Sequence, residues 1–261
     1  MSFPYYLRVA YVGTEFFGWQ IQSHLRSVQN VLWSALKAFD PAVPMPQGTG
    51  RTDAGVHAEA QGALVRLTRA WEPYRLLAAI NAHLPLDVRV MEVQPVHEDF
   101  WPRHHALGKR YVYRLWQGPA ENPFERPFRW HVQGAEPLMI PAMETAAQFL
   151  LGQHDFSSFR HQECAARSPI RTLRRVQISA QGPRLDLVFE GDRFLMHQVR
   201  IMAGTLVEIG KGRIEAEGMN DILAARDRSQ AGRTAPPHGL CLDQIWYEPR
   251  WGIGEACPWE T

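Results

Sequence analysis

The stretch GTGRTDAGVHA, residues 48–58, places small residues and a single carboxylate, Asp53, between two segments of regular structure. Gly48, Gly50 and Gly55 permit backbone conformations and close approaches that a side chain would block. A loop of this composition can hold Asp53 at a cleft and let a substrate come near. The residues alone leave a second interpretation open, in which Asp53 only hydrogen-bonds the backbone of its own turn.

Strand and helix patterns alternate on both sides of this loop. Ser27 can cap a helix whose apolar residues recur with helical spacing over 28–39. We expect further helices at 74–80, 141–151 and about 194–209, and strands at 5–12, 62–67, 88–93, 110–116, 172–179, 185–190 and 240–247. Because the periodicity breaks between 97 and 108, we expect two α+β domains, 1–102 and 103–261.

The composition is that of an ordinary globular protein. The chain has 261 residues, of which 45% are hydrophobic and 21% charged, and no apolar run approaches the roughly 18 residues that a membrane helix needs. The first residues, MSFPYY, do not resemble a secretory signal. We therefore expect a cytoplasmic protein that does not associate with a membrane. The three cysteines form no C-x-x-C pair, and we expect neither a disulfide framework nor a metal site.

Positive charge is concentrated in the middle of the chain. Residues 103–234 hold 19 Lys and Arg against 14 Asp and Glu, although the net charge of the whole chain is only +1. Of the 28 basic residues only Lys37, Lys109 and Lys211 are lysines, and arginine suits phosphate groups and base stacking. This bias is compatible with nucleic-acid binding, but also with arginines that are simply solvated.

Residues 50–57 read G-R-T-D-A-G-V-H, and this segment resembles, without a gap, the signature of the A-type tRNA pseudouridine synthases. Other segments resemble the same family over nearly the whole chain. They are Tyr11-x-Gly13-Thr14-x-Phe16-x-Gly18-Trp19-Gln20, Ser27-Val28-Gln29, Ala79-x-Asn81-x-His83-Leu84-Pro85, Arg110-Tyr111-x-Tyr113, His154-Asp155-Phe156-Ser157-Ser158-Phe159, Phe194-Leu195-x-His197-x-Val199-Arg200 and Ala235-Pro236-Pro237-x-Gly239-Leu240-x-Leu242.

The resemblance implies an α+β fold of two α/β halves, with mostly antiparallel sheets packed side by side around a central cleft. It implies an isomerase that converts uridine to pseudouridine at positions 38, 39 or 40 of tRNA, without a cofactor or metal. The implied partner is the anticodon arm of tRNA, and the implied assembly is a homodimer.

The resemblance also implies roles for individual residues. Asp53 matches the essential catalytic aspartate, which could attack the ribose, attack C6 of the base or remove a ribose proton. Tyr111 matches the tyrosine that contacts the target base, Arg200 the arginine paired with the aspartate, and Arg51 the arginine that fills the gap left by the flipped base. Taken by itself, Arg200 could be an ordinary surface charge of its helix, and we expect Tyr113 to be a core residue.

Several basic residues could contact phosphates around this site, and some of them could simply be solvated. They are Arg103, Lys109, Arg110, Arg160, Arg167, Arg171, Arg174 and Arg175.

Other functions fit the sequence less well. His57-Ala58-Glu59 matches the first half of the zinc deaminase signature, but the P-C-x-x-C half is absent. The serious alternative is a catalytically silent tRNA-binding protein or tRNA folding chaperone that uses the same surface.

Overall fold

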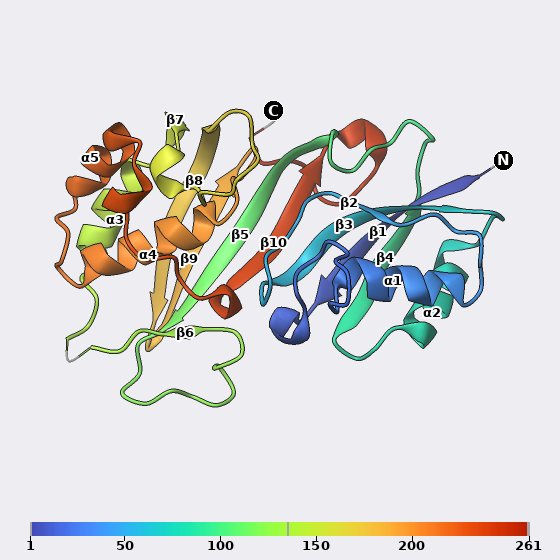
Figure 1. Cartoon of the computed structure of the whole chain (residues 1–261), viewed down its shortest axis with the longest axis horizontal. Helices are drawn as coiled ribbons and strands as arrows, with labels where there is room; N and C mark the ends of the chain where they lie inside the picture. Colours follow the sequence, from blue (N-terminus) through green and yellow to red (C-terminus); the bar gives the residue numbers. More distant parts are fainter. Residues whose placement is uncertain (1, 135, 260–261) are drawn as a thin grey trace. The chain divides into compact units, whose positions relative to one another are not determined.

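The computed structural model describes residues 2–134 and 136–259, and the chain forms two compact units (Figure 1). The first unit takes in the chain through Gly108 and again from Cys241, and the second runs from Lys109 to Leu240. Each unit combines a sheet with helices, so the expected α+β class is confirmed. The division differs from the expected 1–102 and 103–261, because the C-terminal segment folds with the first unit.

The first unit is built on strands in the order β4-β1-β3-β10. Its elements are β1 (Phe3–Tyr11), α1 (Val28–Lys37), β2 (Gln47–Gly48), β3 (His57–Leu67), α2 (Pro73–His83), β4 (Val88–Pro95) and β10 (Leu240–Tyr247). β1 pairs antiparallel with β3 and β4, and β2 pairs antiparallel with β3. β10 is parallel to the start of β3, with Cys241 opposite His57. The loop that carries Asp53 therefore connects the paired strands β2 and β3.

Helices α1 and α2 lie on one face of this sheet (Figure 1). Leu32 and Leu36 of α1 and Leu76 and Ile80 of α2 are fully buried, as the helical spacing predicts. The prediction that Ser27 caps α1 is correct in position, but within the described chain the side-chain hydrogen bond of a cap is absent. Ser27 occupies the N-cap position, but its buried hydroxyl makes no hydrogen bond to any described residue.

An aromatic cluster joins the C-terminal segment to the first unit. The rings of Tyr6, Phe100, Tyr247 and Trp251 contact one another with centroids 5.3 to 6.1 Å apart. Phe100 comes from the segment that we expected to be a boundary, and Tyr247 and Trp251 come from the last residues of the chain. Burial of these large rings explains why both segments belong to this unit.

The second unit is built on strands in the order β5-β9-β8-β7, each antiparallel to its neighbour. Helices α3 and α4 lie on one side of this sheet (Figure 1). The elements of the unit are β5 (Ala106–Trp116), β6 (Trp130–His131), α3 (Ile140–Gln148), β7 (Gly152–Asp155), β8 (Ile170–Gln181), β9 (Arg184–Gly191), α4 (Gln198–Gly210) and α5 (Gly218–Ala225). The strands within each unit are mostly antiparallel, as expected.

Helix α4 begins four residues later than the predicted start near 194. His197 has a φ of 61°, and this left-handed conformation cannot continue a right-handed helix. Of the 13 residues of α4, all of them described, only Arg200 and Glu208 are not buried. A Cβ on Gly204 would lie 1.8 Å from the carbonyl oxygen of Arg233, so glycine is needed where the following segment crosses the helix.

Within the described ranges, no helix combines the length and the hydropathy needed to cross a membrane.

Candidate active site

The loop between β2 and β3 is anchored at both ends. At its start, the backbone N–H of Thr49 donates to the carbonyl of Gly62 (2.9 Å), and the side-chain amide of Gln61 donates to the carbonyl of Gly50 (2.9 Å). Gln61 is completely buried, so its amide lies beneath the loop. These bonds fix the backbone just before Arg51, whose side chain is exposed.

Asp53 opens a tight turn. Its carbonyl oxygen accepts a hydrogen bond from the N–H of Val56 (3.2 Å), and Gly55 at the third position has a φ of 77°. A positive φ at that position is what a type II turn requires, and glycine adopts it without strain. Asp53 itself is half-buried and its neighbour Ala54 is exposed. The turn therefore presents a carboxylate from a fixed backbone.

The segment that follows β1 packs against this loop along its length. The N–H of Trp19 donates to the carbonyl of Thr52 (3.3 Å), and the N–H of Gly55 donates to the carbonyl of Phe16 (3.0 Å). A Cβ on Gly18 would lie 2.3 Å from the carbonyl oxygen of Thr52. Glycine at position 18 thus allows the backbone of this segment to approach the backbone of the loop that carries Asp53.

His57 closes the loop as a buried acceptor. The N–H of Gly13 donates to Nδ1 of His57 (3.0 Å), which requires that nitrogen to carry no proton. His57 is only 4% exposed. Among the described residues there is no group of three or more His, Cys, Asp or Glu side chains that could hold a metal ion.

In the second unit, Tyr111 and Tyr113 lie on the same strand, β5. The ring of Tyr111 packs edge-to-face on Phe194, with centroids 5.1 Å apart, and Tyr111 is 8% exposed. Tyr113 is fully buried and donates its hydroxyl to the carbonyl of Pro236 (2.7 Å). The prediction that Tyr113 is a core residue is confirmed.

Arg200 is held to the segment that follows α5. Its Nε donates to the carbonyl of Ala235 (2.8 Å), and the N–H of Ala235 donates back to the carbonyl of Arg200 (3.1 Å). Because nearly every other residue of α4 is buried, Arg200 is not one charge among many on a solvated helix face. The neighbouring Ala235 and Pro236 therefore orient Arg200 and Tyr113, respectively.

The sequence-predicted site residues are divided between the two units. Arg51 and Asp53 lie two residues apart on one loop of the first unit, and Tyr111 and Arg200 belong to the second. The sequence patterns do not single out Tyr11 or Gln61, whose side chains lie against the loop. Tyr11 lies in one of the segments that resemble the family, and Gln61 lies in none of them. What marks both residues in the sequence is a polar group at an otherwise apolar strand position.

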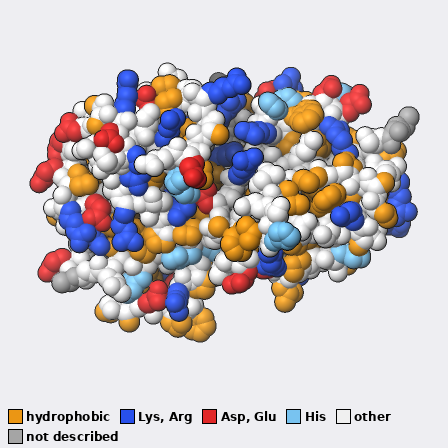
Figure 2. Space-filling view, viewed as in Figure 1, with side chains coloured by type: hydrophobic (Ala, Val, Ile, Leu, Met, Phe, Trp, Pro, Cys, Tyr) orange, Lys and Arg blue, Asp and Glu red, His pale blue; other side chains and the backbone are white. Residues whose placement is uncertain are grey.

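Some of the predicted phosphate-contacting residues are already engaged with a carboxylate. Arg110 contacts the buried carboxylate of Glu190 at 2.7 Å, and Arg175 contacts it at 3.6 Å. Arg167 and Arg174 are exposed. Figure 2 shows Lys and Arg side chains interspersed with Asp and Glu on the surface of the second unit, so the charge is locally mixed.

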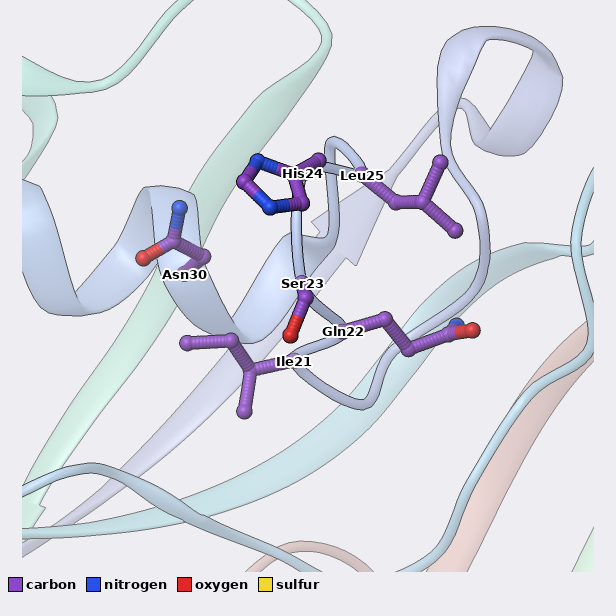
Figure 3. Close-up of a pocket in the computed structure, with 6 residues that line it drawn as sticks. All are labelled: Ile21, Gln22, Ser23, His24, Leu25 and Asn30. Atoms are coloured by element: carbon purple, nitrogen blue, oxygen red, sulfur yellow. The ribbon is translucent and has the colours of Figure 1, made fainter.

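An open pocket of about 660 Å³ lies beside the first turn of α1. It is lined by residues 21–25 of the preceding loop and by Asn30 of the helix (Figure 3). None of the predicted site residues lines it. It is therefore separate from the loop that carries Asp53.

Comparison with known proteins shows which family the chain belongs to. A family model described as tRNA pseudouridine synthase matches residues 146–248. The chain is 42% identical to the tRNA pseudouridine synthase A of Myxococcus xanthus, over 92% of this chain and 91% of that protein. It is 43% identical to that of Azorhizobium caulinodans (93% and 94% covered) and 44% identical to that of Rhodospirillum centenum (92% and 98% covered). The chain belongs to the tRNA pseudouridine synthase A family.

Proposed function

We propose that this protein isomerises uridine to pseudouridine in tRNA, with Asp53 as the catalytic residue. The observation that carries the proposal is the rigid loop around Asp53, which leaves the carboxylate half-exposed in a chain related to tRNA pseudouridine synthases over nine-tenths of its length. A fixed carboxylate that substrate can reach suits a catalyst, because a reacting group must be held within a fraction of an ångström of its productive position.

The reaction moves the ribose from N1 to C5 of the same base. The bond between C1′ and N1 breaks, a bond between C1′ and C5 forms, the C5 hydrogen leaves as a proton and N1 gains a proton. No electrons are gained or lost, so the balance requires no oxidant or reductant. The detached base must be retained and turned, and Asp53 acts on the ribose or on the base while this happens.

Tyr111, Arg200 and Arg51 are proposed to bind the substrate. The ring of Tyr111 can stack on an extruded uracil, and the edge-to-face contact with Phe194 supports its orientation. Arg200 supplies a guanidinium whose plane is set by its bond to Ala235. Arg51 is exposed on the catalytic loop, where it can occupy the gap that a flipped base leaves.

The finer assignments are also proposals. The substrate is uridine at position 38, 39 or 40 of the anticodon arm, and the protein acts in the cytoplasm as a homodimer. They rest on the resemblance of residues 50–57 and of the other segments to this family.

The function is tested by tritium release. The purified protein is incubated without metal or nucleotide with unmodified tRNA that carries [5-³H]uridine, and released tritium is counted. We expect release from tRNAs with uridine at 38, 39 or 40, and none when cytidine replaces uridine at those positions. Binding of tRNA by folded protein without any release would contradict the proposal and favour the silent chaperone.

Replacing Arg200 with Lys keeps the charge but removes the Nε–H group that donates to the carbonyl of Ala235. We expect kcat/KM to fall roughly 10- to 150-fold, because a hydrogen bond from a charged group contributes about 1.5–3 kcal/mol. Arg213→Lys is the matched control, because Arg213 is an exposed arginine just after α4 that pairs with Glu208 at 2.8 Å. Equal kinetics for the two variants would show that the guanidinium of Arg200 has no special role.

If exposed arginines bind the tRNA backbone, affinity will depend steeply on salt. We expect the logarithm of the binding constant to fall linearly with the logarithm of salt concentration, and Arg174→Ala to reduce the slope by about 0.9. Arg126→Ala is the control, because Arg126 is exposed and pairs with Glu121 at 3.3 Å. A slope that neither substitution changes would remove Arg174 from the interface.

A further inference from the structure

Tyr11 ends strand β1 directly beneath the catalytic loop. It is 4% exposed, and its hydroxyl lies 2.8 Å from Oγ1 of Thr52, the residue before Asp53. The register between β1 and β3 shifts by one residue here, since Val9 pairs with Gln61 but Tyr11 pairs with Ala58. Such bulges redirect a side chain next to a site.

Thr52 is held by two hydrogen bonds, and the segment that makes one of them is itself anchored. Its hydroxyl meets Tyr11, its carbonyl accepts from the N–H of Trp19 at 3.3 Å, and the carbonyl of Gly18 is covered by the N–H of Val28 at 3.2 Å, which fixes the contacting segment in turn. Thr52 is itself 8% exposed. The backbone that leads into Asp53 is thereby restrained by a side chain that does not belong to the loop.

The Tyr11 hydroxyl stays protonated at any working pH. Burial raises the pKa of Tyr11 above its usual value, and hydrogen bonds with Thr52 and Gln61 only partly offset this. The group is therefore a neutral hydroxyl that can both donate and accept. Loss of this hydroxyl would leave Thr52 with a buried polar atom and no partner from β1.

We propose that the Tyr11 hydroxyl and Thr52 form a positioning pair that sets the orientation of the Asp53 carboxylate for the isomerisation. The inference rests on the proposed function of Asp53. Neither residue touches substrate in this account. They act by fixing the residue that precedes the catalytic one, so their loss lowers the rate of the chemical step and leaves tRNA affinity unchanged.

Tyr11→Phe removes one oxygen atom and tests the pair most directly. We expect kcat to fall about 10- to 100-fold, because a displacement of about 1 Å at a reacting group can cost 10²-fold, while KM stays within about twofold. Tyr5→Phe is the matched control on the same strand. The Tyr5 hydroxyl donates to the carbonyl of Trp71 (2.8 Å) and accepts from its N–H (2.7 Å), so this variant should lose stability without losing kcat.

Substitutions at Thr52 probe the same bond from the other side. Thr52→Val, which keeps the shape but not the hydroxyl, should match the kcat of Tyr11→Phe, and Thr52→Ser should restore most of the wild-type rate. In the double variant Tyr11→Phe/Thr52→Val the losses should not multiply, because both partners of one bond are gone. If Tyr11→Phe does not fold, the contrast between Thr52→Val and Thr52→Ser decides the question.

The inference is overturned if Tyr11→Phe and Tyr5→Phe have the same kcat, if KM rises while kcat is unchanged, or if the losses of the two single variants multiply. Tritium release by the wild type and its loss in Asp53→Asn are measured in parallel. If the wild type releases none, or Asp53→Asn releases as much, the proposed function fails and the inference falls with it. If both controls behave as expected, a wild-type kcat in Tyr11→Phe overturns the positioning pair but not the proposed function.

Discussion

We expect Asp53→Asn to abolish tritium release while the variant still folds and binds tRNA. The amide has nearly the shape of the carboxylate but can neither attack carbon nor accept a proton as a base, so all three routes open to Asp53 are closed. We expect kcat to fall at least about 10³-fold. Because the backbone bonds of Thr49, Thr52 and Val56 do not involve the Asp53 side chain, we expect the variant to fold.

Glu59→Gln is the matched control for this change. Glu59 is an exposed carboxylate six positions further on, in strand β3. Its substitution should leave kcat within about twofold of wild type, the level expected of a surface change away from a reacting group. Turnover by Asp53→Asn at a rate similar to that of Glu59→Gln would remove Asp53 from the chemistry. Loss of tRNA binding in Asp53→Asn would instead show that the residue has a structural role.

The loop around Asp53 could be predicted because its requirements are local. Gly50 and Gly55 bound a short segment of small residues, and the turn from Asp53 to Val56 uses Gly55 at the position that needs a positive φ. Strand patterns such as residues 5–12 are also local, since the alternation and the aromatic content lie within one segment. These features depend on residues close together in sequence, so one sequence suffices.

The domain division depended on contacts that no local pattern contains. Residues 240–247 were predicted as a strand, but the pattern of a strand does not identify its partner. The parallel pairing of Cys241 with His57 joins residues far apart in the chain, and the ring of Trp251 packs on Phe100. A long-range contact of this kind has no signature in composition or periodicity, which is why the sequence does not assign the C-terminal segment to a unit.

Two local predictions failed because tertiary contacts took precedence. The apolar spacing around Leu195 continues the helical pattern, but His197 in its left-handed conformation delays the start of α4 to Gln198. Ser27 is a favourable cap residue by type, yet its hydroxyl is buried without a partner in the described chain. Residue type gives a preference, and the packing around these two positions overrides it.

Gly18→Ala should be strongly damaging, because the added methyl group would meet the backbone of the loop that carries Asp53. A Cβ at this position would lie 2.3 Å from the carbonyl oxygen of Thr52, closer than real Cβ atoms approach, and 3.1 Å from the carbonyl carbon of Asp53. The obstacle is backbone, which cannot rotate away as a side chain can. Gly18 also has a φ of 84°, a conformation that costs an L residue about 1–3 kcal/mol.

Gly182→Ala separates these two effects. Gly182 has a φ of 56° and nothing within 4 Å of the position of its Cβ, so this variant bears the conformational strain without the collision. We expect it to lose about 1 kcal/mol of unfolding free energy and to keep its kcat. For Gly18→Ala we expect a loss of about 3 kcal/mol and a fall in kcat of about 100-fold or more, since the backbone of Thr52 and Asp53 must move.

Thermal unfolding and tritium release are measured on the Gly18→Ala and Gly182→Ala variants. The two measurements show whether the loop that carries Asp53 must hold its position or tolerates displacement. If Gly18→Ala loses only as much stability as Gly182→Ala and retains its rate, the backbone around Asp53 can yield without consequence for the chemistry. A fall in kcat at temperatures where both variants are fully folded is the result that ties the close approach of Gly18 to the geometry of the carboxylate. The separation holds because the two glycines share a left-handed conformation and differ in what a methyl group would meet.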